Sequence, residues 1–148
     1  MQTFLPYPVF EQSARVLDRA RLGKQRIETQ QLLSANLAGT GWKNHPAAKM
    51  WRGYEPALIV YGIAMCDEWI RRGYRDTRRP LFVEWSRELF EPGQQIEFPP
   101  YIGDPRFHAS HRSNLLRKNP EHYGQFGWTE APDMPYYWPS FAFSESGV

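Results

Sequence analysis

The stretch from Ala57 to Met65 constrains this sequence most, because apolar residues would cover every side of a helix formed there. A helix of that kind is buried, and other helices must pack around it. Pro56 suits its first turn, and Gly73 suits a left-handed residue just after its end. No series of alternating apolar and polar residues predicts a set of strands. The expected fold class is therefore all-α.

The other helices are predicted from capping residues and apolar spacing. A first helix is expected from about Ala14 to Leu37, where Gly residues end it. A short helix follows over residues 81–90, and a last one runs from Asp104 to Lys118. A further short helical piece is expected after Pro46.

Length and composition predict one compact domain, residues 1–148, of about four helices with long irregular connections. The hydrophobic fraction of 41% and the aromatic fraction of 16% exclude general disorder. Residues 1–12 are expected to form an extended arm, and the aromatic C-terminal tail to pack across the helices. Residues 141–148 are expected to be flexible.

Some classes of protein are excluded by what the sequence lacks. No run reaches the roughly 20 apolar residues of a membrane span, and residues 1–8 lack the positive charge of a secretory signal. Cys66 is the only cysteine, which excludes an intrachain disulfide and a cysteine-bound zinc. We expect a cytoplasmic protein with no membrane partner, in which Cys66 is a packed thiol.

Charge is distributed unevenly along the chain. All 18 lysines and arginines lie between Arg15 and Lys118, and the residues up to Lys118 include 12 acidic ones. Four acidic residues and no basic one follow Lys118. Residues 1–118 therefore have a net charge of +6, which favours a polyanionic partner. Ordinary solvated helix faces are the alternative explanation of this charge.

The densest basic segment runs from Arg15 to Glu28 on the first predicted helix. Lys24 lies there among arginines, and neighbouring positive charges favour the neutral, nucleophilic form of an amine. The carboxylate of Glu28, one turn away, could then move protons. The alternative is an exposed basic helix with an ordinary Lys24–Glu28 ion pair. The predicted DNA contacts on this segment are Arg15, Arg19, Arg21 and Arg26.

A second polar segment, residues 107–118, places His108, His111 and Arg112 on one helix face. We expect these side chains to contact phosphates or sugars. The alternative is a buried, hydrogen-bonded histidine pair. Two histidines three residues apart can bind a metal, but no matching ligand set accompanies them, so no metal site is predicted.

Rings and basic side chains alternate between Trp42 and Glu55. Such a mixture suits stacking on an extruded base, and His45 and Arg52 are the predicted DNA contacts there. The alternative is that the tryptophans belong to a core wedge at a helix junction.

Several short motifs follow one another along the chain, and their order can be compared with that of known families. They are Leu17-Asp18, the basic helix through Arg26, Asn44-His45-Pro46, Asp67-Glu68-Trp69-Ile70-Arg71-Arg72-Gly73-Tyr74, His108-x-x-His111-Arg112 and Pro120-Glu121-His122-Tyr123. Over residues from about 15 to 128, this order resembles the pyrimidine-dimer DNA glycosylase and AP lyase family. The resemblance adds His122 and Tyr123 to the expected DNA contacts.

The resemblance implies an all-α protein that bends double-stranded DNA and attacks C1′ of a damaged nucleotide. The attacking group would be the α-amine of the N-terminal residue, assisted by a glutamate from an Arg-Glu pair on the first helix. An imine forms, the glycosidic bond breaks, and β-elimination nicks the strand. No metal or organic cofactor and no obligate protein partner are implied.

Two departures from the family pattern bear on catalysis. Gln2 is bulky and should hinder removal of Met1, so the free amine would be that of Met1. The Arg-Glu pair aligns with Lys24-Gln25, and a glutamine cannot act as the carboxylate does. Glu28 could take that role, Lys24 could supply the amine, or another modified base could be the substrate. The candidate catalytic residues are Met1, Lys24, Gln25 and Glu28.

The favoured interpretation is a DNA-repair glycosylase, with AP lyase activity, acting on a damaged or modified pyrimidine in duplex DNA. One alternative is a non-catalytic nucleic-acid-binding protein on the same scaffold, which the glutamine at position 25 would favour. Another is an enzyme for a small phosphorylated or nucleotide substrate.

Overall fold

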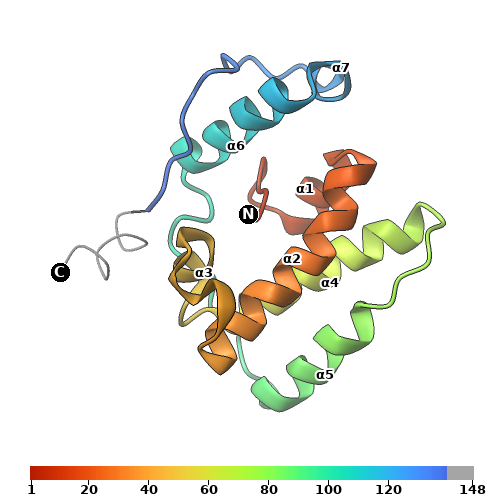
Figure 1. Cartoon of the computed structure of the whole chain (residues 1–148), viewed down its shortest axis with the longest axis vertical. Helices are drawn as coiled ribbons and strands as arrows, with labels where there is room; N and C mark the ends of the chain where they lie inside the picture. The colour runs from red at the N-terminus through yellow and green to blue at the C-terminus, as the bar shows by residue number, and fades with distance from the viewer. Residues whose placement is uncertain (140–148) are drawn as a thin grey trace.

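Helix α4 (Glu55–Arg71) lies at the centre of this computed structural model, which describes residues 1–139. It packs against α1 (Phe10–Val16), α2 (Arg19–Ala38) and α5 (Arg79–Leu89), as Figure 1 shows. The prediction of a buried central helix is confirmed, because the side chains of Ala57, Leu58 and Ile59 have no exposed surface.

The first predicted helix is two helices. The chain is extended at Leu17 and Asp18, so α1 ends before them and α2 begins after them. Leu17 is fully buried at this break, and the backbone N–H of Asp18 donates to the hydroxyl of Tyr123 over 3.0 Å. The break is therefore fixed by a partner that is distant in sequence. The non-helical arm is also shorter than predicted, because α1 already begins at Phe10.

Shorter helices complete the described part of the chain. They are η1 (Gly41–Asn44), α3 (Pro46–Trp51), α6 (Pro105–Lys118), α7 (Pro120–Tyr123) and η2 (Gly124–Phe126). Residues 1–139 thus contain seven α-helices, two 3-10 helices and no strand. The all-α class is confirmed, whereas the estimate of about four helices was too low. The estimate was low because short helices that begin with a capping residue and a proline were counted as parts of the connections between longer helices.

The contact between α4 and α5 depends on a close approach. A Cβ at Gly62 would lie 2.5 Å from the ring of Phe82, which is fully buried. A larger residue at this position would force the ring to move. Gly62 therefore lets the aromatic residue of α5 lie directly on the backbone of the central helix.

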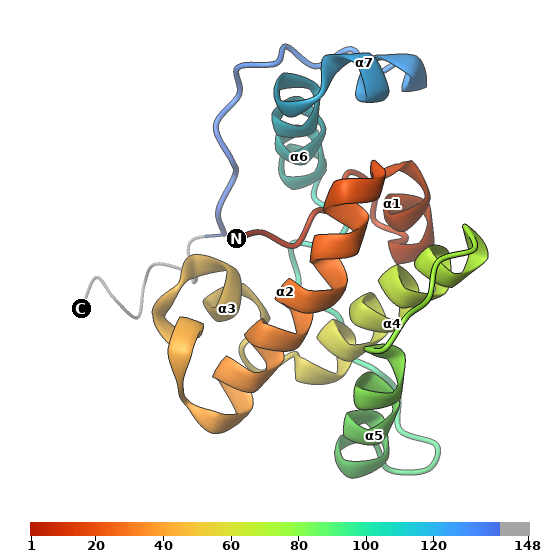
Figure 2. The same ribbon diagram turned by 45° about the vertical axis from the view of Figure 1, so that its right-hand side comes forward.

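The N-terminal arm is buried between two parts of the fold. Residues 2–6 are buried, and Figures 1 and 2 show the N-terminus between α6 on one side and α2 and α3 on the other. The backbone of Phe4 bonds to side chains of α2 and α4, whereas the backbone of Leu5 bonds to α6. The arm thus joins α6 to the rest of the molecule.

The aromatic tail returns along α6. The indole N–H of Trp128 donates to the hydroxyl of Tyr7 over 2.8 Å, and the backbone N–H of Tyr137 donates to Ser110 over 3.0 Å. The tail therefore covers α6 and the start of the chain. The predicted flexible end, residues 141–148, lies outside the described residues. Within residues 1–139, no helix has the length and apolarity to cross a membrane.

Candidate functional site

A polar pocket opens where the N-terminal arm, α2 and α6 meet. Its cavity volume is about 340 Å³, within the range of small-molecule and cofactor sites. Four of its lining residues carry or could carry a positive charge, and one is a carboxylate. The lining residues are Met1, Gln2, Phe4, Ala20, Arg21, Lys24, Glu28, Lys118 and Tyr136.

Helix α2 supplies the charged floor of the pocket through its periodicity. Arg21, Lys24 and Glu28 are spaced three and four residues apart, so they lie on one face of the helix. Gln25 follows Lys24 and therefore points in another direction, toward the core, where it is 1% exposed. Three of the four predicted catalytic residues, Met1, Lys24 and Glu28, thus line the pocket, and Gln25 lies behind it.

Residue 1 is placed at the pocket by hydrogen bonds along the arm. The carbonyl of Gln2 accepts from the side chain of Gln25 over 2.8 Å. The indole N–H of Trp51 donates to the hydroxyl of Thr3 over 3.0 Å. Because these partners belong to α2 and α3, the first residue is held at the pocket by a fixed backbone rather than by a loose terminus.

Gln25 makes a full set of hydrogen bonds around its side-chain amide. Its Oε1 accepts from the backbone N–H of Phe4 over 3.1 Å and from the hydroxyl of Tyr61 over 2.6 Å. Its Nε2 donates to Gln2 and, over 3.3 Å, to the carboxylate of Glu28. One side chain therefore ties the arm, the central helix and the pocket carboxylate together.

Within residues 1–139, Glu28 is the only carboxylate that lines the pocket, and it is half-buried. Among the described residues it has no ion-pair partner, so the Lys24–Glu28 ion pair of the alternative interpretation does not form. A carboxylate without a cationic partner remains available to accept a proton from a bound ligand.

Arg21 is oriented by an acidic partner at the start of α2. Its guanidinium donates to both oxygens of Asp18, over 3.2 and 3.3 Å, and Tyr123 donates to the same carboxylate. Burial alone would raise the pKa of Asp18, but the bonds from Tyr123 and Arg21 lower that pKa overall. Tyr123, a predicted DNA contact, is fully buried and therefore supports the pocket from behind.

Two further predicted DNA contacts on α2 lie outside the pocket. Arg26 is 9% exposed, forms an ion pair with Asp76 and lies over the ring of Trp69. Arg19 is exposed and lies 4.9 Å from the ring centre of Tyr74. Arg19 also lines a shallow groove that shares Ala20 and Lys24 with the pocket, so this surface continues the basic face.

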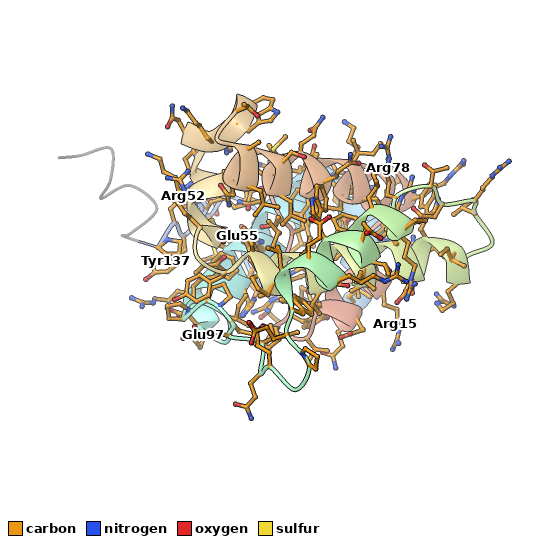
Figure 3. The ribbon with its side chains drawn as sticks, turned by 90° about the horizontal axis from the view of Figure 1, so that it is seen from below. Arg15, Arg52, Glu55, Arg78, Glu97 and Tyr137 are labelled. Carbon is orange, nitrogen blue, oxygen red and sulfur yellow. The ribbon has the colours of Figure 1, made fainter. Side chains whose placement is uncertain are left out.

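The other predicted arginine contacts are far apart. Figure 3 shows Arg15 and Arg52 near opposite ends of the molecule. Arg15 lines a separate hollow with Asp67, Glu68 and Arg71, where Glu68 accepts from both Arg71 and Arg72. Arg52 donates to the carbonyl of Lys43. The structure therefore does not bring either arginine to the pocket.

His45 has a structural role at the start of α3. Its Nδ1 accepts from the backbone N–H of Ala47 over 3.0 Å and caps the helix. Burial and the positive charge of the residue-1 ammonium lower the pKa of His45. Of the nearby rings, Trp51 is fully buried, as the alternative of a core wedge predicted, and Trp42 is 48% exposed.

His108 and His111 hold the arm from the side of α6. His111 Nδ1 accepts from the backbone N–H of Leu5 over 2.9 Å, and His108 Nδ1 lies 2.7 Å from the carbonyl of Leu5. His108 Nε2 accepts from Gly103 over 2.8 Å. Both histidines are buried, so a phosphate contact from them remains an untested prediction that this arrangement disfavours.

Arg112 and His122 have similar structural roles. Arg112 donates to the carbonyl of Pro6 over 2.7 Å and pairs with Glu130, whose pKa it lowers. His122 Nε2 lies 2.8 Å from the carbonyl of Val16. The two residues therefore fasten α6 and α7 to the arm and to α1.

Sequence reasoning missed five residues of the pocket lining, which are Gln2, Phe4, Ala20, Lys118 and Tyr136. Lys118 lies seven residues after His111, hence on the same face of α6. That spacing could have identified it once His111 was known to face the arm. Burial raises the pKa of Tyr136 to about 12, and its position in the irregular tail carries no sequence signal.

The buried histidines predict a loss of stability in mild acid. Burial, with the nearby His108, lowers the pKa of His111 to about 3, whereas an unfolded histidine titrates near pH 6.5. Below about pH 6.5 the unfolded chain binds a proton that the folded chain does not, so stability falls as the pH falls. We expect about 2 kcal/mol to be lost between roughly pH 6.5 and 4.5.

Urea denaturation at a series of pH values measures this effect. His111→Gln keeps an acceptor for Leu5 but removes the titrating ring, so its stability should fall less steeply over the same interval. Equal slopes for the two proteins would show that His111 is not the group responsible.

The geometry described above can be compared with known proteins. A sequence model of the pyrimidine dimer DNA glycosylase family matches residues 1–80, more than half of the chain. The matched residues include the arm and α2, which build most of the pocket. The chain has no significant match among curated proteins or solved structures. Among residues 1–139, no group of histidine, cysteine and acidic side chains is arranged to hold a metal ion.

Proposed function

Because this chain belongs to the pyrimidine dimer DNA glycosylase family, we propose that it is a DNA-repair glycosylase with AP lyase activity on duplex DNA. One observation carries the proposal. Met1, whose α-amine is the candidate nucleophile, and Glu28 line the same basic pocket. An amine and a carboxylate around a space for one sugar are the two groups that imine chemistry at C1′ requires.

In the proposed first step, the residue-1 amine attacks C1′ of the target nucleotide. The new C1′–N bond forms as the glycosidic bond breaks, and the electron pair of the glycosidic bond leaves with the base. Glu28 takes a proton from the attacking amine, and the departing base takes a proton from water. The deoxyribose ring then opens: the C1′–O4′ bond breaks as the C1′=N bond of the imine forms, and Glu28 returns its proton to O4′. Arg21 and Lys24 stabilise negative charge nearby.

In the proposed second step, the imine makes the C2′ proton acidic. Glu28, again a carboxylate, takes this proton. A double bond forms between C2′ and C3′ as the C3′–O bond breaks, and the phosphate leaves with the 3′ part of the strand. Hydrolysis of the imine returns the free amine and completes the lyase reaction. Every catalytic group that these two reaction steps need is a side chain or the α-amine of this protein, so no metal or organic cofactor is part of the proposal.

Gln25 is proposed to position these groups, not to react. Its Nε2 bonds to both Gln2 and Glu28, so it sets where the amine lies relative to the carboxylate. Glu28 supplies the carboxylate that a glutamine at position 25 lacks. This placement weakens the argument that the glutamine indicates a non-catalytic binding protein.

Borohydride trapping tests the proposal. We expect sodium borohydride to trap a covalent adduct between the protein and a duplex that carries an abasic site. Peptide mapping should locate the adduct on the residue-1 amine, and N-terminal sequencing identifies that residue. A duplex that carries a cyclobutane dimer should also lose one glycosidic bond of the dimer and be cleaved, while the freed pyrimidine stays attached to its neighbour through the cyclobutane ring.

The outcomes separate the candidate functions. An adduct on Lys24 would retain the lyase reaction but move the nucleophile. No adduct and no cleavage, with salt-dependent duplex binding, would leave a non-catalytic DNA-binding protein. Tight nucleotide binding without duplex affinity would favour a small-substrate enzyme.

A further inference from the structure

We propose that Lys118 binds a backbone phosphate of the strand that carries the target nucleotide, on the side of the pocket opposite Lys24. Lys118 belongs to the last turn of α6, whereas Lys24 belongs to α2. Both line the pocket. This inference rests on the proposed function, because it assumes that the sugar in the pocket is part of a DNA strand.

The first argument is the balance of charge in the pocket. Arg21 is paired with Asp18, and the described residues give neither lysine an ion pair or a side-chain hydrogen bond. Among the described residues, Glu28 is the only carboxylate that lines the pocket, which it shares with Met1 and both lysines. The pocket therefore has an excess of positive charge that an anionic ligand would balance.

The second argument is the position of Lys118 at the rim. As a residue Lys118 is exposed, so its ammonium is accessible from outside. When a nucleotide enters a pocket sugar-first, its flanking phosphates remain at the mouth. A rim lysine can reach them as a flexible point charge, which is how lysine commonly binds phosphate.

The third argument is that the end of α6, which carries Lys118, is held in a fixed position relative to the arm. His111, two turns earlier on α6, is bonded to the arm, and Asn119 caps α7 through the N–H of His122. The end of α6 is thus fixed relative to residue 1. Partial burial and the nearby Arg21 and Arg117 lower the pKa of Lys118, which agrees with an ammonium crowded by other cations.

The test measures binding to a duplex with a stable tetrahydrofuran abasic analogue over a series of salt concentrations. We expect Lys118→Gln to weaken binding about tenfold at low salt. The slope of log affinity against log salt should fall in magnitude by about 0.9, which corresponds to one lost phosphate contact. Lys118→Arg should retain most of the affinity. Arg87→Gln is the matched control, because it removes one exposed charge on α5, away from the pocket.

A neutral methylphosphonate at single positions identifies the phosphate. At one position beside the abasic analogue it should weaken binding of the unmodified protein but not of Lys118→Gln. An affinity and salt slope of Lys118→Gln equal to those of the unmodified protein would overturn the inference. If the unmodified protein forms no adduct yet Lys118→Gln loses a contact, the proposed reaction fails while the phosphate site stands.

Discussion

Glutamine in place of Glu28 is expected to slow glycosidic-bond cleavage and strand cleavage by about 10²–10⁴-fold, the usual contribution of a positioned acid or base. The substitution keeps the size of the side chain and an oxygen that can accept from Gln25, now bonded over 3.3 Å. It removes only the ability to take a proton. Folding stability should therefore change by less than about 0.5 kcal/mol.

Single-turnover assays with a dimer-containing duplex and an abasic duplex measure both steps. Glu88→Gln is the matched control, since Glu88 is an exposed carboxylate on α5 away from the pocket. The tetrahydrofuran duplex should bind Glu28→Gln as tightly as it binds the unmodified protein. A rate within threefold of the unmodified protein would exclude Glu28 as the proton acceptor.

The centre of the fold could be predicted because its signal is local. Eight apolar residues and one glycine in succession, residues 57–65, leave a helix no solvent face, and this part of α4 packs in the core as the pattern requires. The end of α6 was likewise marked by Asn119-Pro120. Such features depend on neighbours in sequence, so the sequence alone determines them.

The arm could not be predicted in the same way. Pro6 and Pro8 indicate an extended chain but do not say what covers it. Its partners are His111 and Gln25, which lie in distant helices and bond to backbone groups that every residue carries. The same ambiguity affected the histidines of α6. Polar side chains on one helix face can form hydrogen bonds with a phosphate or with buried backbone groups equally well. In this fold the histidines bond to the backbone.

The interpretation of Gln25 differs between sequence and structure, and this difference affects the predicted activity most. Comparison with the family pattern aligned this position with the catalytic glutamate, which made a loss of activity one explanation of the glutamine. In the structure the side chain is buried, and it bonds Gln2, Phe4, Glu28 and Tyr61. The two explanations predict opposite effects of restoring a glutamate.

If Gln25 is the buried link, Gln25→Glu should destabilise the protein by about 3 kcal/mol or more. The new carboxylate oxygen would replace a donor that now faces two oxygens, the carbonyl of Gln2 and the carboxylate of Glu28. Thermal unfolding should occur about 10 °C lower. Because burial beside another carboxylate favours the protonated form, the pKa of the introduced glutamate should rise, and acid should reduce the loss.

Trapping and thermal unfolding, measured on the same samples, distinguish the two explanations. The buried-link explanation requires less adduct and lower stability together, because residue 1 and Glu28 lose their common support. Gln30→Glu is the matched control. Gln30 is also on α2, and its Oε1 accepts from Arg78 over 2.9 Å, so a carboxylate there gains an ion pair. More adduct from Gln25→Glu at unchanged stability would instead identify position 25 as a catalytic position that this chain has lost.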